Sequence, residues 1–431
     1  MSTPSALPVP TNRLVGIDWL RGLVMAVMML DHVRDFVHSG GFFADTLNPE
    51  STTFALYFTR WITHLCAPAF VLLAGVAAGL QMQRAGNDAT ARASVARFLV
   101  TRGLWLIVLE LVVVQWLIAF TFDRSQAANL QVIWAIGVSM VALAALCRLP
   151  SRVVLLIGLV IIAGHNLLDG IRIPGDGGPP PQMLWWHLPW ALLHQQAFLP
   201  LETIAGAFPG AFVWVSYPVL PWIGVMCAGF GAAELYAWPR ERRAMWLLRT
   251  AGALLVLFVV LRLTQWYGDP LPWKSWPTIT QTVMDLFDVQ KYPPSLQFLA
   301  ITLPPSLLAL AWAERTDARG RLVHDTWAGQ FHGALVTLGR VPLFFYLCQW
   351  LLAHLMGIAV SAAQGFDLAP YFMNGEQLFQ LVQRQGPPRI GGPLWLAYIC
   401  WLGGLLLLWP ICRWYAEFKT RRTDLRWLRF L

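Results

Sequence analysis

The sequence predicts an all-helical membrane protein, a polytopic bundle of about ten transmembrane helices with both termini in the cytoplasm. Composition is the first observation: of 431 residues, 57% are hydrophobic and only 13% are charged, against roughly 25% charged in soluble domains. The second observation is that the apolar residues form runs long enough to cross a bilayer core of roughly 30 Å. The third is the distribution of lysine and arginine between alternate loops. This composition excludes a soluble enzyme, a disordered chain and a fibrous protein.

The chain begins with a polar segment rich in proline and serine, residues 1–13, which we expect to be a cytoplasmic tail. It lacks the charged start, apolar core and cleavage site of a signal peptide. Each run that follows approaches the roughly 20 residues needed to span a bilayer. The ten runs are 20–39, 55–80, 102–122, 130–147, 153–168, 211–236, 244–265, 295–313, 341–363 and 394–412. They make up one integral domain, residues 14–415, followed by a basic cytoplasmic tail, residues 416–431.

The segments between the runs differ in character. Two of them, residues 169–210 and 266–294, are long and rich in tryptophan. Such loops are typical of an interfacial aromatic belt, and they also suit a platform on which a sugar ring stacks. Within the runs, Pro218 and Pro221 in the sixth and Pro304-Pro305 in the eighth predict interruptions of helical hydrogen bonding, which are tolerated where backbone lines a cavity.

The basic residues set the orientation. With the N-terminus inside, the cytoplasmic segments hold 21 lysines and arginines, and the opposite loops hold six: Arg124, Arg172, Lys274, Lys291, Arg384 and Arg389. Because cytoplasmic loops retain positive charge, the net charge of +8 reports topology. Nucleic acid is not expected as a partner, since the basic residues are spread over separate short loops. The protein should therefore lie in the inner (cytoplasmic) membrane as a multi-pass protein. The sequence leaves homo-oligomer formation open.

Ionisable residues inside the first two runs are the candidates for a functional site, because such groups are costly in hydrocarbon and are usually kept for function. If Asp18 and Arg21 mark the inner interface, His32 lies roughly 15 Å further along the helix, near the midplane. His64 enters from the opposite side and reaches a similar depth. Asp31, Arg34, Asp35 and Arg60 can pair with one another. Such pairs are also explained by fixing helix register, and each histidine by hydrogen bonding within the core.

Other polar residues within the runs give weaker indications. Glu110 and Arg262 form either a second buried pair or part of a cavity lining, whereas His165 and His354 suit hydrogen bonds between helices. The six cysteines form no CxxC motif and no cluster with histidine. Neither disulfides nor a metal site is therefore expected.

Six ordered sequence blocks resemble the bacterial heparan-alpha-glucosaminide N-acetyltransferase-like family of the transmembrane acyltransferase group. The blocks are residues 18–22 (DWLRG), 29–34 (MLDHVR), 63–70 (THLCAPAF), 217–222 (YPVLPW), 291–296 (KYPPSL) and 339–346 (GRVPLFFY). The resemblance implies transfer of an acyl group from cytoplasmic acetyl-CoA, as co-substrate, to an acceptor on the far side of the bilayer. The expected acceptor is a sugar amine or hydroxyl of an envelope glycan or glycolipid.

The residues fit this scheme in two places. Arg21, with Asp18 beside it and with Arg84 and Arg102 nearby, suits the phosphates of CoA, because arginine donates bidentate hydrogen bonds to phosphate. Most loop arginines are equally explained as topology anchors.

At the midplane, His32 is the expected general base, oriented by Asp31 or Asp35, with His64 or Arg60 stabilising the oxyanion. A covalent acetyl-histidine intermediate is the alternative mechanism. Two rival classes remain, a transporter or flippase for a small anion or lipid-linked sugar and an inert envelope scaffold.

Overall fold

The computed structural model describes residues 14–43, 45–121, 126–174, 184–200, 212–317, 327–422 and 424–429. The predicted tail, residues 1–13, lies outside them. Each of the ten predicted runs contains a helix, which confirms the helical membrane fold. In chain order the helices of these runs are α1 (Val15–Val37), α2 (Phe54–Thr63) with α3 (Cys66–Ala85), α4 (Ala89–Leu109) with the π-helical turn η1 (Glu110–Val114) and α5 (Gln115–Ala119), α6 (Val132–Leu146), α7 (Ser151–Gly164) with η2 (His165–Leu168), α10 (Leu220–Ala232) with η3 (Ala233–Ala237), α11 (Arg240–Thr264), α13 (Leu296–Asp317), α15 (Pro342–Ala363) and α17 (Leu394–Arg421).

Eight helical segments of the described chain are long and apolar enough to cross a membrane: Phe54–Ala85, Ala89–Ala119, Ser151–Leu168, Leu220–Ala237, Arg240–Thr264, Leu296–Thr316, Pro342–Ala363 and Leu394–Arg421. The other two predicted spans are α1 and α6. Helix α1 is long enough, at 23 residues, but it carries the charged residues on which the functional prediction rests. Helix α6 is apolar but has only 15 residues, so it crosses about 22 Å of bilayer at most.

Local sequence signals set several helix ends. The side chain of Thr53 accepts a hydrogen bond from the backbone N–H of Leu56 at the start of α2, and Asp88 caps the start of α4 in the same way. Between α3 and α4 the chain reverses at Gly86, whose φ of 55° lies in the left-handed region that glycine adopts without strain. Pro221 lies in the first turn of α10, where its missing N–H costs nothing.

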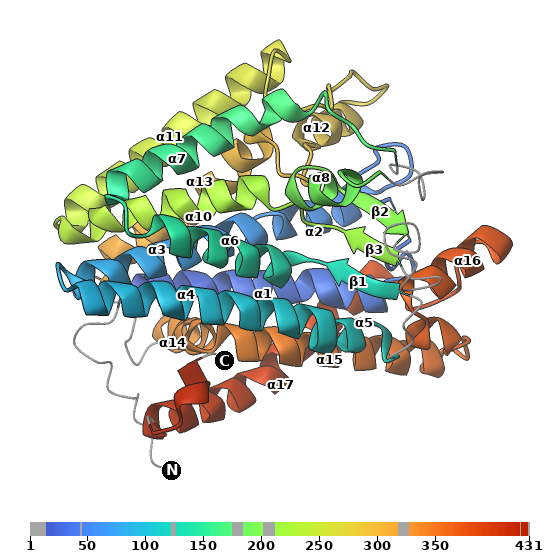
Figure 1. The fold of residues 1–431 in the computed structure, drawn as a ribbon. Helices are drawn as coiled ribbons and strands as arrows, with labels where there is room; N and C mark the ends of the chain where they lie inside the picture. Colours follow the sequence, from blue (N-terminus) through green and yellow to red (C-terminus); the bar gives the residue numbers. More distant parts are fainter. Residues whose placement is uncertain are drawn as a thin grey trace.

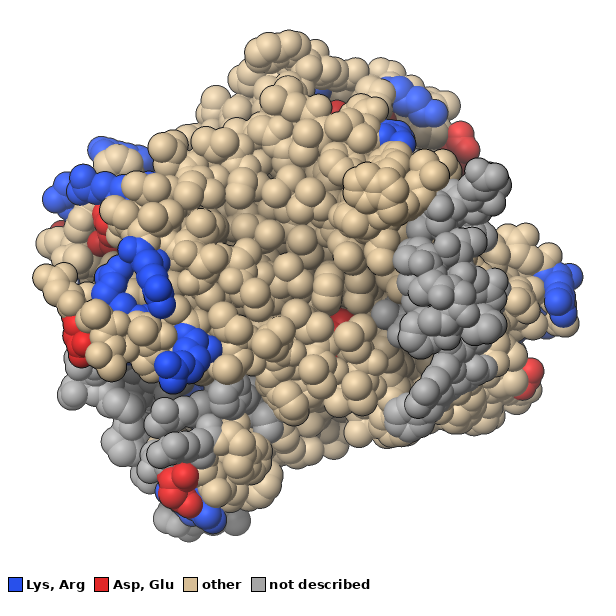
Figure 2. Space-filling model, viewed as in Figure 1, with Lys and Arg blue, Asp and Glu red and all other residues tan. Residues whose placement is uncertain are grey.

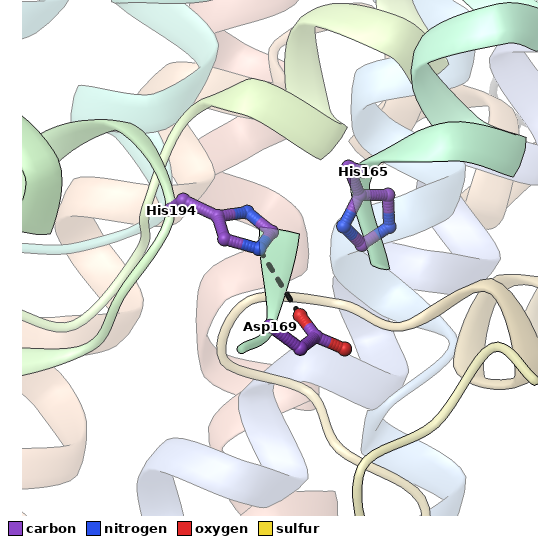
Figure 3. Close-up of side chains that lie close together, drawn as sticks. All are labelled: His165, Asp169 and His194. Atoms are coloured by element: carbon purple, nitrogen blue, oxygen red, sulfur yellow. Dashed lines mark hydrogen bonds and ion pairs between the residues drawn. The ribbon is translucent and has the colours of Figure 1, made fainter. Parts of the chain in front are cut away.

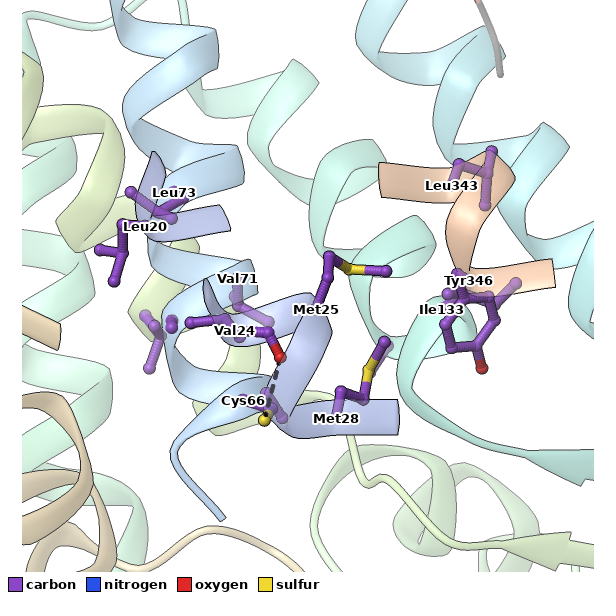
Figure 4. Close-up of a cluster of buried hydrophobic side chains, with 14 of the residues drawn as sticks. Leu20, Val24, Met25, Met28, Cys66, Val71, Leu73, Ile133, Leu343 and Tyr346 are labelled. Atoms are coloured by element: carbon purple, nitrogen blue, oxygen red, sulfur yellow. Dashed lines mark hydrogen bonds between the residues drawn. The ribbon is translucent and has the colours of Figure 1, made fainter. Parts of the chain in front are cut away.

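Helix α1 runs through the middle of the bundle (Figure 1) and packs against α3, α13, α14, α15 and α17. Figure 4 shows part of this core: Leu20 and Val24 of α1 face α3, whereas Met25 and Met28 point toward α6 and α15. The thiol of Cys66 donates to the carbonyl oxygen of Val24 over 3.5 Å. Side chains that interdigitate in this way fix the rotation of α1 and hence the direction of its charged residues.

A helix that the sequence analysis missed, α14 (Trp327–Arg340), packs against the first half of α1. The two backbones approach so closely that a Cβ built on Gly22 would lie 1.8 Å from the carbonyl oxygen of Leu335. A Cβ built on Gly339 would lie 1.8 Å from the carbonyl oxygen of Asp18. Glycine at both positions is what permits this contact. With 14 residues, α14 is too short to resemble a membrane span.

The structure also corrects two details of the predicted runs. Residues 212–215 of the sixth run form a strand, and α10 begins only at Leu220 because Pro218 and Pro221 initiate the helix rather than interrupt it. Helix α13 continues through Pro304 and Pro305, so the expected interruption does not end it.

One end of the bundle carries a small sheet and short helices (Figure 1). Strand β1 (Gln126–Leu130) pairs in parallel with β3 (Phe212–Val215), which pairs antiparallel with β2 (Ala197–Pro200). The short elements are α8 (His187–Leu193), α12 (Ile279–Phe287), η4 (Ala369–Phe372) and α16 (Gly375–Gln385), and η5 (Arg426–Arg429) lies near the C-terminus. On the face drawn in Figure 2, most basic side chains gather at the other end, and a broad uncharged belt covers the middle. This asymmetry is the one that the positive-inside rule predicts for a membrane protein.

Candidate active site

Three neighbouring cavities lie in the part of the chain that the structure describes, and two of them adjoin α1. The basic cavity, about 330 Å³, adjoins the first half of α1. The central cavity, about 230 Å³, adjoins its last turns. The outer cavity, about 510 Å³, lies at the end with the small sheet. Basic and central cavities share the lining residues Met28, Phe70 and Val132. Central and outer cavities share Gln196, Trp214 and Tyr292. The central cavity therefore adjoins both of the others, with three wall residues in common on each side.

The basic cavity brings together three of the four residues predicted to bind the co-substrate. Asp18, Arg21 and Arg102 all line it. Arg21 donates to Asp18 over 3.5 Å and to the carbonyl oxygen of Leu73 over 3.4 Å. The fourth residue, Arg84, is exposed at the end of α3 and is not among the lining residues.

Two further cations of the basic cavity come from distant parts of the chain. Arg340, at the end of α14, and Lys419, near the end of α17, also line it. The sequence analysis counted both as topology signals. Four basic side chains around one carboxylate leave the cavity with a net positive charge, which favours a polyanionic ligand.

The central cavity contains the charge network that the sequence predicted. Asp31 accepts hydrogen bonds from Arg34 over 3.1 Å and from Arg60 over 2.5 Å, and Arg34 also donates to Asp35 over 2.5 Å. Asp31, Asp35 and Arg60 line the cavity, and their side chains are 14–17% exposed. Because each charge has an opposite partner, the network can stay ionised at this depth.

His32 lies in the same cavity and is held by aromatic rings. Its ring stacks on Trp350 of α15 with centroids 3.8 Å apart, and Tyr346 lies edge-on at 6.1 Å. The Nδ1 atom is buried and has no hydrogen-bond partner among the described residues. The expected orientation of His32 by Asp31 or Asp35 therefore does not act through this atom. Stacking on Trp350 holds the ring instead, and Nδ1 can still form a hydrogen bond with a ligand.

His64 is buried at the end of α2, but its side chain lies outside the central cavity. Its ring packs against Phe298 of α13 with centroids 5.6 Å apart, and it is not among the residues that line the central cavity. Of the two groups expected to stabilise an oxyanion, only Arg60 lines that cavity.

A residue that sequence reasoning missed, Lys291, also lines the central cavity and is 8% exposed. It comes from the loop between α12 and α13, next to Tyr292, which lies against Tyr217 with ring centroids 5.0 Å apart. Burial raises the pKa of Tyr292, but Lys291 and Arg60 outweigh that effect and the pKa lies below its ordinary value. Burial and the neighbouring Tyr292 raise the pKa of Tyr217. The only sequence signal for these residues was their place in two of the six blocks.

The four weaker candidates from the sequence have different contacts in the structure. Glu110 accepts a hydrogen bond from the backbone of Trp134 over 3.2 Å, whereas Arg262 donates to four backbone carbonyls around α12. They do not pair with each other. His354 does link separate segments, since its ring nitrogens contact the carbonyl oxygens of Leu117 and Tyr371. His165, for which the same role was expected, makes no such bond among the described residues.

Comparison with known proteins decides the family. The family model for the heparan-alpha-glucosaminide N-acetyltransferase catalytic domain matches residues 13–262, more than half of the chain. The chain belongs to that family. No curated protein matches the sequence. Family membership and the apolar helices identify a multi-pass membrane protein with an acetyltransferase catalytic domain.

The matched region of this acetyltransferase extends from α1 to α11. It contains His32, Arg60 and most of the basic cavity, including Arg21 and Arg102. Lys291 and Trp350, which complete the central cavity, come from beyond the match. The site is thus assembled from both parts of the chain.

Proposed function

We propose that this protein moves an acetyl group from acetyl-CoA, bound at the basic end, to a sugar amine or hydroxyl of an envelope glycan or glycolipid that enters from the opposite side of the inner membrane. The observation that carries the proposal is the series of three cavities, with cations at one end, His32 in the middle and aromatic side chains at the other. A cytoplasmic donor and an acceptor on the far side can then meet without either crossing the whole bilayer.

The basic cavity supports acetyl-CoA as the donor. Its four cations complement the phosphates of CoA, and the arginine fork suits bidentate binding of phosphate. Arg21 and His32 are eleven residues apart on α1, which corresponds to about 16 Å along the helix axis. The extended pantetheine arm of CoA is of comparable length. With its phosphates at Arg21, acetyl-CoA would place its thioester near Met28 and Phe70, which line both the basic and the central cavity.

The central cavity supplies the groups that acyl transfer needs. In a direct reaction, His32 takes the proton of the acceptor amine or hydroxyl as that atom attacks the thioester carbonyl. The carbon–sulfur bond then breaks, and the CoA thiolate takes the proton from His32. Arg60 and Lys291, which line the same cavity, are placed to stabilise the oxyanion. In the alternative mechanism His32 is itself acetylated and then deacylated by the acceptor.

The outer cavity supports a sugar as the acceptor. Trp214 and Phe379 contribute aromatic rings to its lining and Gln196 contributes an amide, whereas the amide of Gln195 bonds to the backbone of Ile173. Aromatic faces with polar groups at their edges suit a sugar, which has an apolar face and a ring of hydroxyls.

A transfer assay tests the proposal. Purified protein in lipid nanodiscs is incubated with labelled acetyl-CoA and glycans that end in an amino sugar or a free hydroxyl. We expect label transfer by the wild type and a loss of about 10²- to 10⁴-fold in kcat for His32→Ala, with CoA binding retained. Acid-stable label on the acceptor alone indicates direct transfer, whereas label on the wild-type protein that His32→Ala lacks indicates an acetyl-histidine.

His64→Ala is the matched control, since His64 is buried nearby but does not line the central cavity. Equal activity of His32→Ala and wild type, together with no CoA binding, would overturn the proposal. Flux of a lipid-linked sugar or small anion in proteoliposomes without acyl-CoA would instead support a transporter.

A further inference from the structure

Three polar side chains outside the catalytic network converge between α7 and α8. His165 begins the short helix η2 that follows α7, Asp169 comes directly after η2, and His194 follows α8 (Figure 3). One potential ligand atom from each of the three lies within 4.8 Å of the other two. His194 Nε2 lies 3.0 Å from Asp169 Oδ1. Two segments nearly thirty residues apart in the sequence thus bring two imidazoles and a carboxylate to one point.

The cluster has hydrogen-bonding capacity that the described residues leave unused. Both ring nitrogens of His165 are buried without a partner, and so is Nδ1 of His194. Each histidine is only 3% exposed. A buried polar atom without a partner costs about 1–3 kcal/mol, so a residue with two such atoms calls for a ligand. In Figure 3 the His165 ring stands beside Asp169 and opposite His194, where a shared ligand would lie.

We propose that His165, Asp169 and His194 bind a divalent transition metal ion, with Zn²⁺ as the best match. Two imidazole nitrogens and one carboxylate oxygen are a donor set that zinc favours, whereas Mg²⁺ and Ca²⁺ prefer oxygen ligands alone. Bonds of about 2.0–2.1 Å in a tetrahedral site place ligand atoms about 3.3 Å apart. His194 and Asp169 are already near that separation, so only His165 has to approach.

The surroundings support a metal site. Asn166 donates to the second oxygen of Asp169 over 2.8 Å, and its own oxygen accepts from the backbone of Leu296 over 2.9 Å. Such bonds hold a ligating carboxylate in position. Asp169 and His194 also line the outer cavity. Three protein ligands leave a fourth position, which faces that cavity and can hold water or a hydroxyl of the acceptor.

Metal analysis of the tag-free protein tests this site without any acetyl-transfer assay. After incubation with Zn²⁺ and removal of free metal, we expect about one zinc ion per wild-type chain and its loss in His165→Ala and His194→Ala. His187→Asn is the matched control, because His187 is equally buried on α8 and bonds only to the backbone of Leu184 in the structure. It should keep the metal.

Co²⁺ gives a second readout that does not depend on stoichiometry. Tetrahedral Co²⁺ absorbs visible light strongly, and this absorption should form with the wild type and His187→Asn but not with Asp169→Asn. Monodisperse elution of each variant excludes misfolding as the cause of lost metal. If the wild type retains no more Zn²⁺ than a His165→Ala/His194→Ala double variant, the site does not bind metal, and the three residues only tie α8 to α7.

Discussion

Asp31 joins two arginines in the central cavity, so its substitution by asparagine should destabilise the protein measurably. Among the described residues Arg60 contacts one carboxylate, that of Asp31, over 2.5 Å, whereas Arg34 contacts both Asp31 and Asp35. Removing one partner of a buried ion pair costs about 3–5 kcal/mol. The 15–17% exposure of the Asp31 and Arg60 side chains to the cavity reduces this figure through solvent screening. We expect a loss of roughly 2–4 kcal/mol for Asp31→Asn.

The assay is thermal unfolding in detergent, followed by tryptophan fluorescence, and a double-mutant cycle with Arg60→Gln. The double variant should be less destabilised than the sum of the two single variants, because it leaves no unpaired charge. Asp35→Asn is the matched control and should cost less, since Arg34 keeps Asp31. A wild-type unfolding temperature for Asp31→Asn, or additive effects in the cycle, would refute the ion-pair reasoning.

Three further predictions concern the ends and the packing of the bundle. Arg21→Ala should raise the dissociation constant of CoA about 10- to 100-fold, the worth of a charge-assisted hydrogen bond, whereas Arg84→Ala should leave it unchanged in calorimetry. Gly339→Ala should lower stability by about 1–3 kcal/mol in thermal unfolding, because its Cβ would meet the backbone of α1, whereas Gly164→Ala meets nothing within 4 Å and should not. Burial, Asp269 and Asp285 raise the pKa of Asp288, outside the membrane-spanning segments, to about 7. Its protonated form is favoured by folding, so stability should fall as pH rises from about 4 to 7, and Asp288→Asn should flatten that dependence in a pH series of unfolding temperatures.

The sequence predicted the parts of the fold that depend on local composition. Ten apolar runs appear as helices because each has to satisfy its own backbone in lipid, and that requirement is readable from one segment at a time. Helix α14 escaped detection because it is short and carries Gln330 and His332 among its apolar residues. Its place beside α1 depends on glycines from both helices, which no single segment reveals.

The site shows the same difference between features that one segment reveals and features that depend on contacts between distant segments. The pairing of Asp31 with Arg60 was predictable, since the first two runs are adjacent and antiparallel. Lys291, however, reaches the central cavity from a loop some 260 residues away along the chain. Apart from its place in one of the six blocks, nothing in the local sequence distinguishes it from the other outer cations. His165 was misread for a related reason: its neighbours in space, unlike its neighbours in sequence, include a second histidine and a carboxylate.

The basic and central cavities meet at three apolar side chains, Met28, Phe70 and Val132, and this border has an electrical consequence. Apolar side chains at the border of the two cavities disfavour a continuous column of water there, which helps an energised membrane to keep its ion gradients. Moving one elementary charge across the membrane potential exchanges about 2.3 kcal/mol per 100 mV. An acetyl group is neutral, whereas CoA carries several phosphate charges. In the proposed function, a border that passes the small neutral group and holds back the polyanion would let the cell modify an external acceptor without drawing on its membrane potential.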